Sequence, residues 1–196
     1  MFRIRKVGHA GTLDPMATGL LILCTGKRTR DVQEYMGLEK EYEGEMELGG
    51  VTASFDAETP VLERKSLEGL LPERVIETFR KFQGPQEQLP PMYSAVKREG
   101  KRLYEYARKG VEVERSPRQI QIHRLDVARC ELPRVAFSVV CSKGTYVRSL
   151  VHDIGTALGC GGYLTALRRT RIGSYHVRDA ATIEELSGLR ELDERK

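Results

Sequence analysis

Apolar residues recur along the chain with two different spacings, which predict a mixture of strands and helices. Residues 40–48 alternate between apolar or small side chains and glutamates, a pattern typical of a strand with one exposed face. Residues 135–141 show a similar alternation, and residues 163–172 predict a final long strand. The continuous apolar run within residues 20–25 predicts a short buried strand.

Spacings of three and four residues predict two amphipathic helices. In residues 72–82, Pro72 stands in the first turn and the apolar positions form one stripe. In residues 146–158 the apolar positions recur in the same way, and the glycine-rich residues 159–162 end the helix. Shorter helices are predicted at residues 29–36, 103–108 and 182–186.

The remaining segments predict loops and irregular connections. Residues 7–19, 50–64 and 84–91 contain the turn-forming residues that interrupt regular structure. A phase change in the alternation near His123 and Arg124 predicts a β-bulge. Strands and helices do not alternate regularly, so the predicted fold class is α+β with a mixed, mostly antiparallel sheet. We find no repeat or linker and expect residues 1–196 to form a single domain.

Composition excludes several classes of protein. Apolar residues make up 40% of the chain, and no apolar run approaches the ~18 residues of a membrane span. We therefore expect a soluble, cytoplasmic protein that does not bind membranes. The four Cys and four His are scattered without the spacing of a metal site, so we expect no bound metal.

Positive charge is concentrated in two segments that lie far apart in the sequence. Residues 1–30 carry six Lys or Arg and a single acid, Asp14. Residues 134–178 carry seven Lys or Arg and a single acid, Asp153, whereas the rest of the chain is net acidic. If the two segments meet in the fold, they form an electropositive surface that attracts a polyanion. The alternative interpretation is an ordinary solvated surface.

Three segments contain residues suited to chemistry or binding. Asp14 lies in a Gly-rich, basic loop, where nearby cations would keep a nucleophilic carboxylate ionised, although Leu-Asp-Pro is also a common turn. Residues 142–148 lie where a strand passes into a helix, a position that favours anions; an ordinary capped helix start is the alternative. The arginines of residues 167–171 either contact phosphates or line an exposed strand edge.

Taken together, several segments resemble the TruB-type tRNA pseudouridine synthases. The longest and most specific is residues 6–19, with the sequence KVGHAGTLDPMATG. The others follow in the order of the family and extend the resemblance over about residues 6–185: 40–42, 90–97, 102–110, 141–148, 158–162 and 167–171. The resemblance implies a pseudouridine synthase fold and isomerisation of uridine 55 in the TΨC loop of tRNA. It also implies that a monomer acts on the T-arm of tRNA without a cofactor or metal.

The resemblance assigns roles to individual residues of the expected site. Asp14 becomes the catalytic nucleophile, adding either to the ribose C1′ or to the base, and Arg148 pairs with it and keeps it ionised. Tyr146 contacts the base and is a candidate to remove its C5 proton. Tyr42 stacks on the target base, and His9 helps to fill the space that the extruded nucleotide leaves.

Further residues are assigned to RNA binding. Leu167 would form an apolar wall beside the flipped base, and Lys143, at the strand-to-helix junction, would contact the substrate. Residues 85–118 would form a loop-and-helix thumb that closes over the RNA. The expected phosphate and thumb contacts are Lys97, Arg102, Arg108, Arg168, Arg169 and Arg171.

The sequence departs from the pattern of the family at both ends. A strand and a Lys-Pro-x-Gly loop that normally precede the first motif are expected to be absent, as is a C-terminal RNA-binding domain. Two alternatives to a stand-alone enzyme therefore stay open. One is an RNA-binding or tRNA-folding protein with weak or no catalysis, and the other is a guide-RNA-dependent relative with the same catalytic core.

Overall fold

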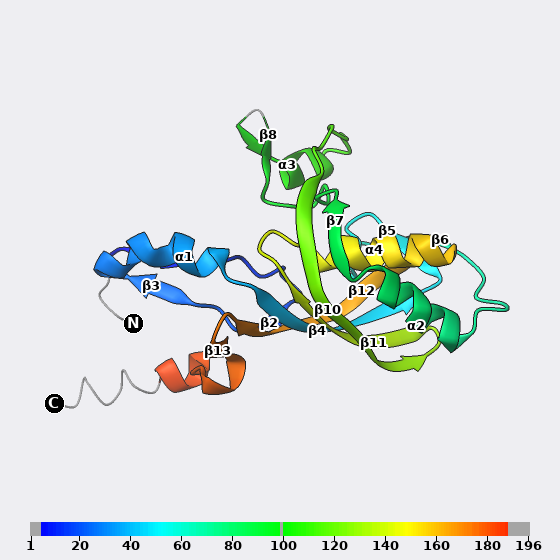
Figure 1. Cartoon of the computed structure of the whole chain (residues 1–196). Coiled ribbons are helices and arrows are strands. Elements are labelled where there is room, and N and C mark those ends of the chain that lie inside the picture. Colours follow the sequence, from blue (N-terminus) through cyan, green and yellow to red (C-terminus); the bar gives the residue numbers. More distant parts are fainter. Residues whose placement is uncertain (1–4, 99, 188–196) are drawn as a thin grey trace.

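The computed structural model describes residues 5–98 and 100–187 and is built on a seven-stranded sheet (Figure 1). Its order is β13–β12–β4–β11–β10–β7, with every neighbouring pair antiparallel, and β2 adds to β12 in parallel. The predicted mixed, mostly antiparallel sheet of an α+β fold is therefore confirmed. The strands are β2 (Thr18–Gly19), β4 (Lys40–Leu48), β7 (Gly84–Gln88), β10 (Arg118–Glu131), β11 (Arg134–Cys141), β12 (Gly162–Ile172) and β13 (Tyr175–His176).

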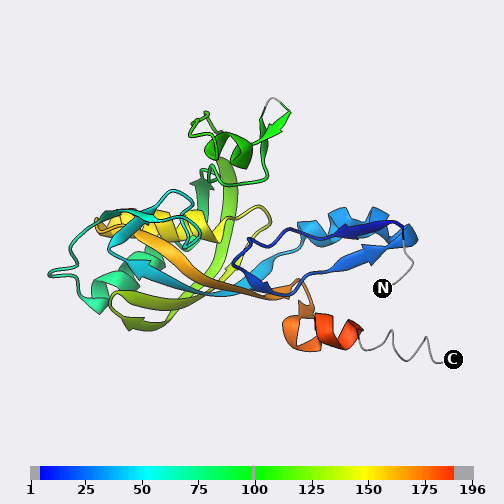
Figure 2. The same cartoon turned by 180° about the vertical axis from the view of Figure 1, so that it is seen from behind.

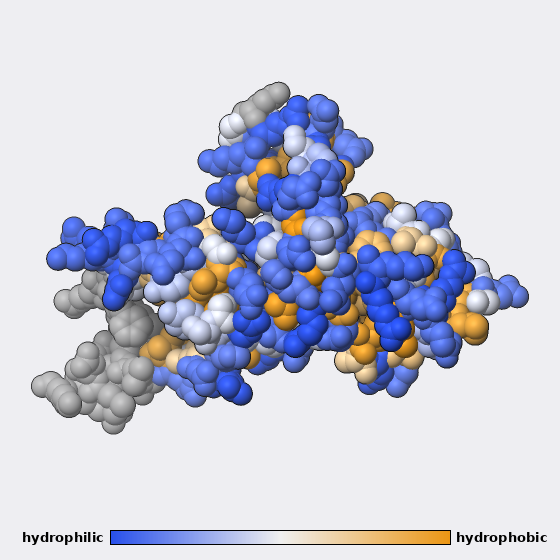
Figure 3. Space-filling view, viewed as in Figure 1, coloured by the Kyte–Doolittle hydropathy of each residue, from blue (hydrophilic) through white to orange (hydrophobic). Residues whose placement is uncertain are grey.

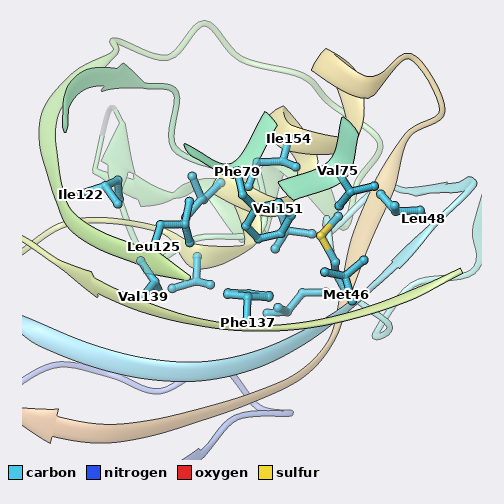
Figure 4. Packing of buried hydrophobic residues seen from close by; sticks show 14 of the residues in the cluster. Met46, Leu48, Val75, Phe79, Ile122, Leu125, Phe137, Val139, Val151 and Ile154 are labelled. Carbon is cyan, nitrogen blue, oxygen red and sulfur yellow. The ribbon is translucent and has the colours of Figure 1, made fainter. Parts of the chain in front are cut away.

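Two helices, α2 (Pro72–Lys81) and α4 (Val147–Leu158), cover one face of this sheet and enclose the core (Figure 4). Phe79 of α2 packs on Phe137 of β11, with ring centroids 5.8 Å apart. The Phe137 ring lies over Gly44, its register partner on β4, where an added Cβ would come within 2.6 Å of the ring. The alternation predicted for residues 40–48 and both amphipathic helices are confirmed.

The other face of the sheet carries a ladder of cross-strand ion pairs. Glu41 of β4 pairs with Arg124 of β10 at 2.7 Å and with Arg171 of β12 at 2.8 Å. Oε2 of Glu45, on β4, lies 3.6 Å from Nη2 of Arg129, on β10. Exposed pairs contribute about 1 kcal/mol or less each, whereas the Glu41–Arg171 pair is partly buried.

An arm projects from the sheet and consists of β1 (Val7–His9), β3 (Leu23–Thr25), the 3₁₀ helix η1 (Gly26–Asp31) and α1 (Val32–Gly37) (Figures 1 and 2). The prediction of a buried strand at residues 20–25 is wrong, because in the described part of the chain β3 pairs with β1 alone and Leu23 is 56% exposed. The apolar run belongs to a two-stranded ribbon with one open face. The first residues of the loop predicted at residues 7–19 therefore form a strand, β1, which pairs with β3.

Two segments predicted to be irregular contain strands. Residues 50–64 include the hairpin β5 (Gly50–Thr52) and β6 (Val61–Arg64). Residues 84–91 begin with β7, whose Pro85 is tolerated because β7 is the last strand of the sheet. The segment between Gln88 and Arg118, which we call the thumb, projects from the sheet within the predicted range of about residues 85–118 (Figure 1). It contains β8 (Lys97–Arg98), β9 (Lys101–Arg102) and α3 (Leu103–Ala107).

The remaining predictions of local structure agree with the fold. The β10–β11 register shifts between Ile122 and Arg124, at the predicted bulge. Gly159 ends α4 in the left-handed conformation, with a φ of 84°. The 3₁₀ helix η2 (Val177–Asp179) follows the sheet, and residues 183–187 are helical. Within residues 5–98 and 100–187, no helix is long and apolar enough to cross a membrane.

Candidate active site

Asp14 and Arg148 form a two-pronged ion pair between residues 134 positions apart in the sequence. The Arg148 Nε donates to one carboxylate oxygen at 2.8 Å, and an Nη2 hydrogen donates to the other at 2.7 Å. The Arg148 side chain is buried, whereas that of Asp14 is partly open. The planar guanidinium thus fixes the plane of the carboxylate and leaves one side of it accessible.

Arg148 lies in the first turn of α4 and is held there by further acceptors. Its Nη1 donates to the Ser54 carbonyl at 3.0 Å, and its Nη2 donates to the Tyr93 carbonyl at 3.0 Å. Its Nε also lies 3.4 Å from Oδ2 of Asp56. The guanidinium is therefore enclosed by two carboxylates and two main-chain carbonyls, which balance the cost of burying its charge.

Asp56 is a site residue that the sequence analysis missed. It is 1% exposed, and its Oδ1 accepts hydrogen bonds from the Ser54 hydroxyl at 2.5 Å and from the Glu58 amide at 3.0 Å. Its Oδ2 has no hydrogen-bond partner among the described residues and faces Arg148. The only local signal was an aspartate between Ser54 and Thr59 in a turn-rich segment, which is typical of many surface turns.

The loop that carries Asp14 is fastened to β12 by Arg169. The Arg169 Nε donates to the Leu20 carbonyl at 2.8 Å, and its Nη2 donates to the Gly11 carbonyl at 3.1 Å. Gly19 pairs with Arg169 so closely that an added Cβ would lie 2.3 Å from the Arg169 carbonyl oxygen, and its φ is 101°. Only glycine fits there, so the motif glycine allows the Asp14 loop to join the sheet.

A second attachment of the same loop comes from the hairpin side. The carboxylate of Glu58 accepts a hydrogen bond from the Met16 amide at 3.0 Å. Burial and the neighbouring Asp56 raise the pKa of Glu58. The Asp14 loop is therefore held from both sides, by Arg169 and by Glu58.

An open cleft of about 830 Å³ contains Asp14 and lies between the arm, the thumb and the start of α4. Residues from both basic segments of the sequence line it. Most of the predicted site residues line it: His9, Asp14, Tyr42, Tyr146, Arg148, Arg169 and the thumb residues Lys97, Arg102 and Arg108. Figure 3 shows mostly hydrophilic residues on the thumb on the face in view.

Two polar residues of β4, the half-buried Tyr42 and the buried Lys40, also line the cleft. Burial raises the pKa of Tyr42 to about 12, so this phenol stays neutral over the physiological range. Lys40 is 7% exposed, and its Nζ donates to the main-chain carbonyls of Met36 and Leu38 at 2.6 Å each. Burial and the nearby Arg169 lower the pKa of Lys40. Lys40, another residue outside the predicted site, thereby ties the end of α1 to the sheet.

The geometry is at odds with two of the predicted phosphate contacts. Arg169 is 1% exposed and holds the Asp14 loop, and Arg171 is occupied by Glu39, Glu41 and the Gly173 carbonyl on the back of the sheet. Arg168, between them, is exposed. Arg168 and Arg169 point to opposite faces because side chains alternate along a strand, and the register shift between Arg169 and Arg171 places Arg171 on the face opposite to Arg169.

Two other predicted site residues lie outside the cleft lining. Leu167 is buried and belongs to the core cluster. Lys143 is exposed on the loop before α4, whose residues Ser142 and Gly144 do line the cleft. The roles of Leu167 beside the flipped base and of Lys143 in substrate contact remain predictions.

No metal-binding group of His, Cys, Asp or Glu occurs among the residues that the structure describes. The polar groups that line the cleft include the Asp14 carboxylate, several guanidinium groups and several phenols. Such a set can supply a nucleophile, orient it and contact a planar base.

Comparison with protein families divides the chain at the start of α4. Residues 1–147 match the family model of the TruB family pseudouridylate synthase (N terminal domain). Residues 148–195 match the model of the tRNA pseudouridylate synthase B C-terminal domain. Asp14 and Arg148 thus come from different matched regions, although one core contains side chains from both.

The sequence is also similar to curated enzymes named tRNA pseudouridine synthase B. It is 48% identical to that of Flavobacterium johnsoniae over 178 residues, which cover 91% of this chain and 78% of the relative. The relative from Clostridium tetani is 46% identical over 94% of this chain and 64% of its own length. The relative from Burkholderia lata is 50% identical over 93% of this chain and 56% of its own length. The chain therefore spans about half to three quarters of the length of these relatives.

Solved structures show the same fold. The structure described as a Cbf5-Nop10-Gar1 complex superposes with a TM-score of 0.72 and 30% identity, covering 96% of this chain and 47% of that one. An H/ACA RNP bound to a substrate RNA containing 2′-deoxyuridine gives a TM-score of 0.71 and 27% identity over 98% and 47% of the two chains.

Proposed function

This chain belongs to the TruB family of pseudouridylate synthases, and we propose that it converts uridine 55 in the TΨC loop of tRNA to pseudouridine. The proposal rests on the Asp14–Arg148 pair in an open cleft between the arm and the thumb. It further holds that a monomer acts on the T-arm in the cytoplasm.

Asp14 acts as the nucleophile in this proposal. Its carboxylate adds to the target nucleotide, at the ribose C1′ or at the base, while Arg148 keeps it ionised and aimed. The bond between N1 and C1′ breaks, the base turns over, and a bond forms between C5 and C1′, while the bond from the Asp14 carboxylate to the nucleotide breaks and frees the carboxylate. The proton on C5 is then lost and N1 gains a proton, so the reaction is an isomerisation without a net change in atoms.

The residues around Asp14 divide the remaining tasks. Tyr42 stacks on the target base as a neutral phenol, which agrees with its raised pKa of about 12. Tyr146 lines the same cleft and is placed to contact the base, where it serves as the candidate acceptor for the C5 proton. His9 fills the gap in the RNA loop after the uridine flips out, a step that costs a few kcal/mol.

The thumb supplies the contacts that hold the RNA over the cleft. Lys97, Arg102 and Arg108 line the cleft from that side. The guanidinium carbons of Arg102 and Arg108 lie 5.9 and 5.3 Å from the centre of the Tyr104 ring. Such stacked cations and aromatic rings suit both phosphates and unpaired bases.

Comparison of the relatives favours the stand-alone enzyme over a guide-RNA-dependent relative. The curated tRNA pseudouridine synthases B are 46–50% identical to this chain, whereas the Cbf5 complex structure is 30% identical. The alternative of an RNA-binding protein with weak or no catalysis is decided by measuring turnover.

The test is a single-turnover assay of the purified chain with a tRNA transcript and no guide RNA. We expect pseudouridine at position 55, and no conversion in a matched transcript that carries cytidine there. Binding of the transcript without any product would contradict the proposal and support the RNA-binding alternative. Product that forms only after a guide RNA is added would support the guide-dependent class.

A further inference from the structure

We propose that Gln88 and Arg118 are positioning residues that hold Tyr146 for its contact with the target base. They are register partners at the point where β7 and β10 meet, and both lie against Tyr146. This inference rests on the proposed function, in which Tyr146 accepts the C5 proton. It adds two residues to the site that neither the charge pattern nor the sequence motifs had singled out.

Gln88 holds the main chain of Tyr146 by a reciprocal pair of hydrogen bonds. Its side-chain Nε2 donates to the Tyr146 carbonyl at 3.0 Å, and its Oε1 accepts from the Tyr146 amide at 2.7 Å. The Gln88 side chain is 2% exposed, so these bonds form away from water. A side-chain amide donates and accepts at once, which a carboxylate or an apolar side chain of similar length cannot do.

The attachment lies at the position that sets the direction of the Tyr146 side chain. Tyr146 is the extended residue immediately before α4, with φ −98° and ψ 109°. Ser149, one turn further along, donates its hydroxyl to the Leu89 carbonyl at 3.1 Å. The end of β7 is therefore docked to the first turn of α4, and Tyr146 is fixed relative to Arg148 on that same turn.

Arg118 acts on the ring of Tyr146. Its guanidinium carbon lies 5.8 Å from the ring centroid, and both side chains line the cleft. A planar cation near an aromatic face favours a narrow range of ring orientations. Gln88 thus fixes the backbone and Arg118 restricts the ring, so that the phenolic oxygen keeps one position in the cleft.

The test separates positioning from a structural effect by using tRNA with deuterium at C5 of the target uridine. We expect Gln88→Met and Arg118→Met to lower the single-turnover rate about 10–100-fold, as a misplaced catalytic group does. Because the step that is slowed removes the C5 proton, the deuterium isotope effect on that rate should rise above the wild-type value. Arg118→Lys, which keeps the cation, should recover part of the rate.

Controls make each outcome decisive. Arg124→Met removes a guanidinium from the same strand on the far face of the sheet and should keep the wild-type rate and isotope effect. If Gln88→Met fails to fold, the two Arg118 variants test the inference by themselves, because the Arg118 side chain is only half-buried. Variants that keep the wild-type rate, or lose rate with an unchanged isotope effect, would overturn the inference. Absence of product from the wild-type chain would instead contradict the proposed function.

Discussion

The Asp56 carboxylate faces Arg148 from within the protein, with its Oδ2 3.4 Å from the Arg148 Nε. Arg148 hydrogen-bonds to Asp14 on the side of the cleft, so one guanidinium joins a buried acid to a partly open one. Asp56 therefore gives Arg148 an anionic contact that does not depend on Asp14.

Asp56→Asn should slow catalysis more than it weakens RNA binding. The amide keeps the size of the side chain but presents no charge to Arg148. We expect a single-turnover rate lower by about 10–100-fold, because the guanidinium loses its fixed orientation, and a free energy of unfolding lower by about 1–3 kcal/mol. Urea denaturation and tRNA binding measured on the same samples separate these effects, with the exposed Asp126→Asn as the control. A wild-type rate would show that Asp14 and the Ser54 and Tyr93 carbonyls orient Arg148 without Asp56.

Arg168 and Arg169 should behave differently although they are neighbours on β12. Arg168 is exposed, so Arg168→Gln should flatten the slope of log affinity against log salt by about 0.7–1 if it contacts a phosphate. Arg169 is buried in contact with the Leu20 and Gly11 carbonyls, so Arg169→Gln should leave that slope unchanged and lower stability. Measuring tRNA affinity at several salt concentrations for both variants tests these two predictions. A flattened slope for Arg169→Gln alone would reverse the assignment.

Tyr42→Phe should retain most activity from pH 6 to 9. Burial raises the pKa of Tyr42 to about 12, so its hydroxyl stays protonated over that range. We therefore expect the aromatic ring, and not a phenolate, to contact the target base. Tyr42→Leu removes the aromatic face and should lose considerably more activity. Single-turnover rates across the pH range measure both variants. A large loss in Tyr42→Phe would assign a chemical role to the hydroxyl.

Asp153 on α4 should make stability depend on pH below neutrality. Burial raises its pKa from 3.8 to about 6, so the folded state favours the protonated carboxyl. The stability from this group is present below about pH 4 and is lost as the pH rises through 6. Asp153→Asn should therefore be more stable than the wild type at pH 7, by about 1 kcal/mol because the half-buried carboxyl is partly solvated. Urea melts at pH 7 and pH 4 test this, since the gain should vanish at the lower pH.

Local patterns predicted the elements that bury one regular face. The alternation of β4 and the apolar stripes of α2 and α4 reflect direct contact with the core, so they predicted these elements within a residue or two. The apolar run at residues 20–25 failed because an apolar ribbon strand and a buried central strand have the same composition. The strand β7 was not predicted because its Pro85 indicates a break in regular structure. A proline excludes a central strand but is tolerated in an edge strand such as β7.

The site was less accessible to sequence reasoning because long-range contacts assemble it. Asp14 and Arg148 were paired through resemblance to a family, as no local spacing relates residues 134 positions apart. Asp56 and Gln88 act through buried contacts with partners that only the fold brings near. Arg169 was predicted to contact phosphate because it lies in a basic run of the sequence. Only the fold shows that its side chain is buried.

The central claim is that Asp14 is the nucleophile, and Asp14→Asn tests it most directly. The amide keeps the shape of the side chain and removes the nucleophilic charge. Pseudouridine is measured under single-turnover conditions, with tRNA affinity and unfolding measured on the same preparation. We predict a folded variant that binds tRNA and forms no pseudouridine. Conversion of uridine 55 by that variant at a rate near that of the wild type would contradict the account.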